Sequence, residues 1–471
     1  MIRSRHLAGL TALLISCALV RETRQSPEVP PTVPTVNPAL LSGGEGTVFD
    51  TSPLAFSFAL RNLPTATRRG FAVGNAFFND NWVTAPASTN GRDGLGPFFN
   101  AASCSSCHLR DGRGEPPASE EEPLVSLLIR LGLPTEVPGQ APIPDPRYGD
   151  QIQPRAILDV PPEARPSIQW NTLTGQFNDG EHYTLREPQL VLHDLAYGDL
   201  HPDIRTSLRV APSVFGLGLV EAIPESDIES WADPEDADGD GISGRVNRVW
   251  SENHETTMLG RFGWKANIAT LRDQTASAFL GDIGITSSLH PVESHTSVQN
   301  AAAQVPSGGA PELDDHKLDR ITLYLQTLAV PARRNVDESD VQQGEQLFQQ
   351  TGCAACHRPT FTTSSDQNID ALNNQRIQPY SDFLLHDMGP GLADHRSDFA
   401  ATGSEWRTPP LWGLGLQEVV NGHEFLLHDG RARGIEEAIL WHGGEAESAQ
   451  NAYRSLHIDQ RANLIEFVRS L

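Results

Sequence analysis

Apolar residues recur at helical spacing in two segments, residues 318–328 (LDRITLYLQTL) and 462–471 (ANLIEFVRSL). Each segment closes one half of the chain. An amphipathic helix is also predicted earlier in each half, where Phe99 and Phe348 precede a cysteine by five residues. Between these helices, the loop "RVAPSVFGLGLVEAIPE" matches "RTPPLWGLGLQEVVNGH". The pattern predicts two halves built on one plan of helix, Arg-Pro-Gly loop and closing helix.

The two halves differ in length. The first half contains a long stretch rich in Pro, Gly and Asp, with short strand-like runs such as "HYTLREPQLVLHDL". A charged, proline-containing linker at residues 329–339 separates the halves. We therefore expect a mainly α-helical protein, with one domain at residues 46–332 that carries the insertion and a second at residues 333–471.

Two Cys-x-x-Cys-His motifs use four of the five cysteines. This spacing is typical of covalent c-type haem, in which two thioether bonds hold the porphyrin and the adjoining imidazole binds the iron. A zinc site would need four ligands, and a redox dithiol would not need the histidine. The predicted haem-binding residues are Cys104, Cys107 and His108, and Cys353, Cys356 and His357. Each half is then expected to be a cytochrome-c-like helical domain, the first with a loop-rich insertion containing short strands.

The N-terminus has the pattern of a secretion signal. Arg3 and Arg5 precede an apolar run at residues 7–15, which is too short for a permanent membrane anchor. The residues up to Cys17 (LISC) also resemble a bacterial lipobox, which predicts a lipidated Cys17 after removal of residues 1–16; alternatively, this cysteine lies within a discarded signal. A Pro-rich tether follows, to residue 45. We expect a periplasmic lipoprotein that meets a bacterial membrane only through its lipid.

Composition narrows the choice of partners. The chain has 471 residues and a net charge of -25, which argues against nucleic acid as a ligand. An acidic surface favours solubility or a basic electron donor, so we expect a small redox protein as the donor.

The insertion contains a possible calcium loop in "DPEDADGDGISGRVN". Asp236, Asp238 and Asp240 alternate as in the first half of such a loop, and a glycine follows them. Asn247 stands at the twelfth position, where a bidentate Glu is usual. The motif predicts a structural Ca2+ site, with a solvent-exposed acidic turn as the alternative.

Beyond the cysteine motifs, the chain carries long segments in a fixed order: "VGNAFFNDNWVTAPASTNGRDGLGPFFNAASCSSCHLRDGRG", "DADGDGISGR", "GRFGWKAN", "LAVPARR", "LLHDMGPGLAD", "EWRTPPLWGLG" and "FLLHDGRARGIEEAILWHGGEAE". Together with the motifs, they resemble the bacterial di-haem c-type oxidoreductases grouped as peroxidases or thiol-oxidoreductase-like proteins, within the di-haem cytochrome c peroxidase superfamily. The resemblance covers residues 41–471.

This resemblance implies that one haem relays electrons and that the other reacts with hydrogen peroxide. The related peroxidases carry an iron-binding Met where this chain has Leu427, and leucine cannot bind iron. The second haem is therefore either open or bound by another residue. Met388 is the leading substitute, although a lone Met more often packs in a core. The competing candidates are His386, His428 and His442. For the first haem, the candidates are His182, His193 and His201.

The resemblance also suggests residues around the haems. Arg407 and Arg431 are candidate propionate partners, with surface pairing as the alternative. Glu436, Glu437 and Glu221 are candidate acid/base residues, although a Glu pair at a helix start also complements the helix dipole.

The predicted function is therefore that of an exported di-haem peroxidase, which takes electrons from a small redox protein and reduces hydrogen peroxide to water. One alternative is a haem oxidase or oxygenase that acts on a protein or organic substrate. The other is a non-catalytic electron-transfer protein with both haems six-coordinate.

Overall fold

Two pairs of crossing helices are the longest helical elements of the computed structural model, which describes residues 36–89, 91–135, 137 and 139–471. In the first pair, α1 (Thr65–Asn79) packs on α5 (Asp315–Thr327), and in the second α6 (Ser339–Gln350) packs on α10 (Ile458–Ser470). The helices predicted at residues 318–328 and 462–471 and ahead of Cys353 are confirmed.

Both helix pairs cross at a glycine. A side chain at Gly74 would collide with the backbone oxygen of Arg320, and one at Gly344 with that of Asn463. Because hydrogen is the only side chain that fits, the backbones approach each other directly. The α5 helix begins at a capping residue, Asp314, whose carboxylate accepts a hydrogen bond from the Lys317 N–H at 2.9 Å.

Shorter helices lie between these pairs. They are α2 (Leu217–Glu221), α3 (Glu225–Glu229), α4 (Leu271–Ala278), α7 (Gln417–Asn421), α8 (Ile435–Leu440) and α9 (Glu447–Arg454). A π-helical turn at Phe279–Ile283 continues α4.

The strands form small antiparallel sheets. The sheet of order β3-β2-β7 contains Gln151–Ile152, Leu127–Gly132 and Arg205–Val210. The pairs are β1 (Phe98–Phe99) with β4 (Arg155–Ala156), β5 (Arg165–Gln176) with β6 (His182–His193), β8 (Arg248–Ser251) with β9 (Thr256–Leu259), β10 (Phe361–Thr362) with β11 (Arg376–Ile377), and β12 (Leu385–Asp387) with β13 (Glu405–Arg407).

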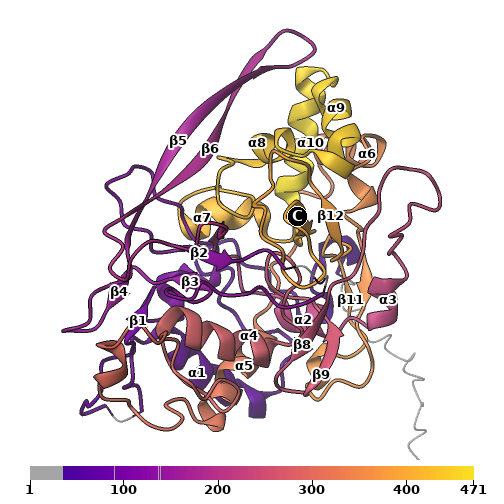
Figure 1. Ribbon diagram of the computed structural model, residues 1–471. Helices are drawn as coiled ribbons and strands as arrows, with labels where there is room; N and C mark the ends of the chain where they lie inside the picture. Colours follow the sequence, from indigo (N-terminus) through magenta and orange to yellow (C-terminus); the bar gives the residue numbers. More distant parts are fainter. Residues whose placement is uncertain (1–35, 90, 136, 138) are drawn as a thin grey trace, which may run out of the picture. The chain divides into compact units, whose positions relative to one another are not determined.

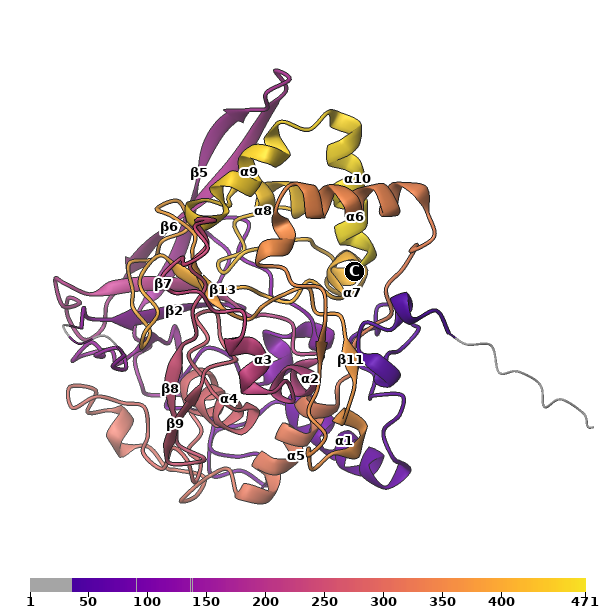
Figure 2. The same cartoon turned by 90° about the vertical axis from the view of Figure 1, so that its right-hand side faces the viewer.

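The β5–β6 hairpin extends toward α8 and α9 in both views of the ribbon (Figures 1 and 2). Its register runs from Arg165 opposite His193 to Gln176 opposite His182. At its tip, the Asn178 side chain donates a hydrogen bond to Ser455 at 2.7 Å. The hairpin of the first half therefore reaches the last helices of the second half.

The prediction of a mainly α-helical protein with two cytochrome-c-like domains is wrong, because helix accounts for 28% and strand for 18% of the structure. Pro, Gly and Asp disfavour helix in the long insertion, but its backbone groups still need hydrogen-bond partners. Pairing into strands supplies them. The fold is mixed α and β.

The amphipathic helix predicted ahead of Cys104 is also wrong. Helix α1 ends at Asn79, and Phe98–Phe99 form strand β1, which pairs with β4. The intervening sequence contains Pro86, Pro97 and several glycines, which do not support a continuous helix.

Two hydrophobic clusters form the main core, and each draws residues from both halves. The first cluster combines Trp82 and Tyr324 with Trp412, and the second combines Ile168 with Phe467. Residues Pro38–Leu471 form one compact unit, distinct from residues 1–37. The domain boundary at residue 332 stays a prediction.

Some predictions fall on residues outside the described structure: the signal at 1–16, the lipidated Cys17 and the tether as far as residue 35. Within the described residues, no helix has the length and apolar character needed to cross a membrane.

Candidate functional site

The first Cys-x-x-Cys-His motif forms a tight turn that fixes the orientation of its histidine. Cys104–Ser106 is a single 3-10 turn, and His108 follows it. The His108 Nδ1 lies 2.7 Å from the backbone oxygen of Pro212. A carbonyl can only accept, so Nδ1 carries the proton and Nε2 carries the electron pair. Burial lowers the pKa of His108 to about 4, which keeps the ring neutral at pH 7.

The second motif repeats this geometry in the other half. Cys353–Ala355 is again a 3-10 turn, and the His357 Nδ1 lies 2.9 Å from the backbone oxygen of Tyr380. Burial lowers the pKa of His357 to about 4. An aromatic ring flanks each histidine at 6.2 Å between centroids, Phe78 beside His108 and Phe348 beside His357. Two histidines far apart in sequence thus present the same neutral tautomer.

The four cysteines of these motifs are not in disulfides. Burial raises the pKa of Cys104 and of Cys107 to about 12, and it also raises the pKa of Cys353. A catalytic dithiol needs a thiolate, which burial disfavours. The burial of these thiols therefore argues against a catalytic dithiol.

Buried donors without acceptors lie close to both motifs in sequence. Among the described residues, Arg113 Nε, Arg358 Nε and Trp441 Nε1 are buried and have no hydrogen-bond partner. Arg113 follows the first motif by five residues, and Arg358 directly follows His357. An unmet buried donor costs about 1–3 kcal/mol. Haem propionates are acceptors of the kind these groups lack, so the residues present fit the group.

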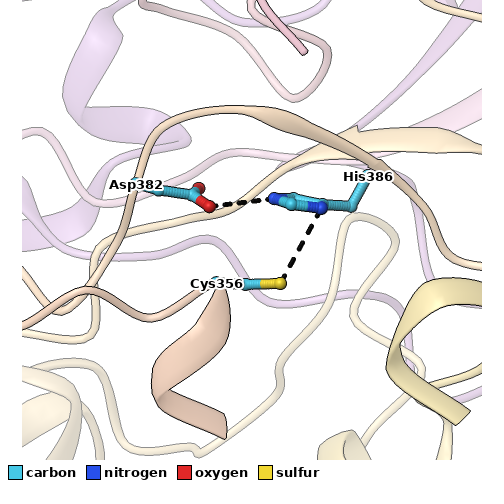
Figure 3. A group of neighbouring side chains, drawn as sticks. All are labelled: Cys356, Asp382 and His386. Carbon is cyan, nitrogen blue, oxygen red and sulfur yellow. Dashed lines mark hydrogen bonds and ion pairs between the residues drawn. The ribbon is translucent and has the colours of Figure 1, made fainter. Parts of the chain in front are cut away.

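The His386 ring lies beside Cys356 of the second motif, between two acidic side chains. Its Nε2 is 2.9 Å from Asp382 and its Nδ1 is 2.7 Å from Glu445. Burial alone would lower the pKa of His386, but hydrogen bonds to Asp382, Cys356 and Glu445 raise it to about 12. Figure 3 shows the ring between Asp382 and the Cys356 sulfur, which is 3.7 Å from Nδ1. Both ring nitrogens of this imidazolium are therefore already bound to acidic side chains.

The other candidate ligands of the second haem lie in different surroundings. Met388 directly follows β12, and its side chain packs against the second core cluster. His428 stacks on Trp406, with ring centroids 3.7 Å apart and an angle of 9°. The His442 Nδ1 is 2.7 Å from a backbone oxygen of α8. Ligation by any of them stays a prediction.

The candidate ligands of the first haem flank strands of the insertion. His182 and His193 are the two ends of β6, and His182 is exposed. The His193 Nε2 lies 3.1 Å from Ser167. His201 precedes β7 and accepts a backbone hydrogen bond of 3.2 Å. Their ligation of the first haem stays a prediction.

The two candidate propionate arginines already donate hydrogen bonds to other groups. Arg407 donates through Nε to the backbone oxygen of Gly263 at 3.0 Å. Arg431 donates through Nε to the carboxylate of Asp429 at 2.9 Å. Burial lowers the pKa of Arg407 to about 10. Propionate binding by either residue stays a prediction.

The three candidate acid/base glutamates also have local partners. Glu221 accepts the first N–H of α4 at 2.7 Å. Glu436 accepts from the Tyr453 hydroxyl at 2.9 Å, and Glu437 accepts from Arg433 Nε at 2.7 Å. As predicted, the glutamate pair lies in the first turn of a helix, α8. Their acid/base role stays a prediction.

The acidic loop gathers a different set of groups from the one in the predicted motif. Oxygens of Asp233, Asp236 and Asp238 lie within 4.8 Å of one another. Asp240 accepts the Ile242 N–H at 2.8 Å instead. Asn247 is buried elsewhere, where its amide donates to the backbone oxygens of Lys265 and Asp398 at 2.9 and 3.0 Å.

Sequence reasoning missed a buried carboxyl next to the first motif. Asp282 lies in the π-helical turn, and its backbone oxygen accepts the N–H groups of Asn100 and Ala101, just ahead of Cys104. Gln151 donates to its carboxyl at 2.9 Å. Burial raises the pKa of Asp282, and its charge in turn raises the pKa of Cys104. In the sequence, Asp282 is a single acidic residue after an apolar run. Nothing in that pattern indicates that it lies next to the first motif.

Two histidines in the same tautomer, each following a Cys-x-x-Cys motif, are the arrangement expected of a protein with two c-type haems. The sequence model of one family, described as "Di-haem oxidoreductase, putative peroxidase", matches residues 37–130 and 135–471. The chain belongs to this di-haem oxidoreductase family. Searches of curated proteins and of solved structures find no match.

Proposed function

We propose that the protein is an exported enzyme that reduces hydrogen peroxide with electrons relayed between two covalently attached c-type haems. The observation that carries the proposal is the matched geometry of His108 and His357, in which a backbone carbonyl accepts the Nδ1 proton and the electron pair is on Nε2. Family membership supports an oxidoreductase with two haems. Covalent attachment follows from the Cys-x-x-Cys-His spacing in both halves.

The chain's residues would have distinct tasks around the haems. When bound, haem iron supplies the electron transfer and the reaction with peroxide. The backbone oxygens of Pro212 and Tyr380 hold the two histidines in the tautomer that binds a metal through Nε2. Arg113 and Arg358 offer unpartnered buried N–H groups to propionates. Burial raises the pKa of Asp282, whose backbone oxygen accepts the N–H groups of Asn100 and Ala101 just ahead of the first motif.

The experiment that tests this proposal counts haems and measures peroxide consumption in one preparation. We expect two covalent haems per chain by mass spectrometry, and loss of one in the C104A/C107A variant and of the other in C353A/C356A. With a reduced small cytochrome as donor, the unaltered chain should turn over peroxide at its full rate and both double variants should be slower. His395, an exposed histidine, provides the control variant H395A.

The two parts of the proposal are separable in this experiment. A chain without covalent haem would overturn the attachment. A chain with both haems and no peroxide consumption would overturn the peroxidase activity and leave the oxidase and electron-transfer alternatives.

We also propose that the chain is lipidated at Cys17 and receives electrons from a small redox protein at its acidic surface. The lipobox-like residues before Cys17 and the net charge of -25 support these two points. Mass spectrometry of the mature N-terminus tests the first, and salt dependence of the donor's reaction rate tests the second. The acidic loop at Asp236 and Asp238 is proposed to bind Ca2+, which metal analysis of the purified protein tests.

A further inference from the structure

The histidines near the second motif differ in the groups that contact their ring nitrogens. Both nitrogens of His386 are within 2.9 Å of a carboxylate. The His428 ring lies flat on Trp406, and its Nε2 is 3.4 Å from Asp429. An imidazole must turn a free electron pair toward a metal in order to bind it. Both ring nitrogens of His386 are therefore engaged by carboxylates, and the Nε2 of His428 faces Asp429.

His442 is held in the same way as the two motif histidines. Its Nδ1 lies 2.7 Å from the backbone oxygen of Ala438, in the last turns of α8. As at His108 and His357, the carbonyl acceptor places the proton on Nδ1 and the electron pair on Nε2.

The chain after His442 folds back onto the second motif. Gly443 and Gly444 lie directly against the backbone oxygens of Met388 and Asp387, at the end of β12. The next residue, Glu445, binds the His386 ring.

The Nδ1 of His386 is in turn 3.7 Å from the Cys356 sulfur. His442 is thus brought to the motif from an element other than the one that carries His357.

We propose that His442 is the second axial ligand of the haem held by Cys353, Cys356 and His357. This inference rests on the proposed function only in that a haem must be attached at the second motif. A nitrogen of His442 would then supply the axial ligand that Leu427 cannot provide. Both axial positions of this haem would be filled. The second haem then relays electrons, and the haem on His108 is the one that reacts with peroxide.

The test compares two variants, one that lacks the proposed ligand and one that lacks a competing ligand. In the ferric protein, we expect electron paramagnetic resonance to show one low-spin haem with two imidazole ligands. H442A should convert this one haem per chain to high spin, and added imidazole should restore the low-spin signal. M388L, which removes the competing sulfur of Met388 and keeps the side-chain volume, should leave the spectrum unchanged.

A third variant protects the test against a misfolded H442A protein. H442M supplies a thioether from the same position, so that haem should stay low-spin while its reduction potential rises. The variant H428F keeps a flat ring on Trp406 and is the matched histidine control, with an unchanged spectrum expected.

Two outcomes would overturn the inference: an unchanged low-spin signal in a folded H442A protein with both haems attached, or conversion to high spin in M388L instead. The result does not depend on peroxide turnover. A wild-type protein with the expected ligands but no peroxidase activity would overturn the proposed function and leave the ligand assignment standing.

Discussion

At the scale of single residues, Arg186 on β6 joins the hairpin to the second half. Its guanidinium carbon lies 3.9 Å from the centre of the Trp170 ring and 4.5 Å from that of Phe425. The same group donates hydrogen bonds to the backbone oxygens of Gly430 and Arg431 at 2.9 and 3.0 Å. One side chain therefore fixes the loop that follows Leu427.

The substitution R186K tests this contact. Lysine keeps the charge, but it lacks the planar fork that stacks on rings and donates to two carbonyls at once. We expect a loss of about 1–3 kcal/mol in the free energy of unfolding, measured with urea. The control R165K alters an exposed arginine paired with Asp194 and should change stability by less than about 1 kcal/mol. Equal effects of the two substitutions would contradict the assigned role.

At the scale of elements, the contact between α6 and α10 holds the second motif in place. Helix α6 ends at Gln350, and the turn that contains Cys353 follows after two residues. The crossing depends on Gly344, which touches the backbone of Asn463. Any shift of α6 along α10 would move the cysteines with it.

The substitution G344A should therefore be harmful, although alanine forms helices better than glycine by about 1 kcal/mol. The added methyl group meets backbone, which cannot move aside as a flexible side chain can. We expect a net loss of about 1–3 kcal/mol in stability and a reduced haem content at the second motif. The control G91A places its methyl group in open space and should be nearly neutral in thermal unfolding. A neutral G344A would show that the helices can separate without cost.

At the scale of the whole described unit, a buried charge cluster joins the two halves. Arg209 of β7 pairs with Asp398, and Arg396 donates to the same carboxylate at 2.6 Å. Lys265 is 2.9 Å from Asp394. Burial alone would raise the pKa of Asp398, but the two arginines outweigh it and hold the pKa well below its ordinary value.

This cluster predicts a defined pH dependence. A depressed pKa means that the unfolded chain takes up the proton first, so the contribution of Asp398 is complete above about pH 4 and declines as the pH falls below it. D398N should cost about 3–5 kcal/mol at pH 7, because two buried arginines lose their counter-charge. The deficit should shrink below about pH 4, as measured by urea unfolding across pH. D194N, at an exposed pair, should show neither effect.

Local patterns in the sequence were sufficient for several features. Helical periodicity located α5, α6 and α10, and alternation located β6, because these elements satisfy their own spacing rules within a few residues. The two Cys-x-x-Cys-His motifs were also identified from the sequence, because each is a short run of consecutive residues. Periodicity failed where prolines and glycines left the choice between loop and paired strand to distant partners, as around Phe99.

The sequence by itself thus determined the family, the two predicted attachment points and the helices beside the second of them. Only the tertiary structure decided the mixed α and β fold and brought the carbonyls of Pro212 and Tyr380 to the motif histidines. It also distinguished His442 from the other histidines of the second half. The physical reason is that ring orientation depends on backbone acceptors, and a backbone oxygen has no residue type by which a sequence can mark it.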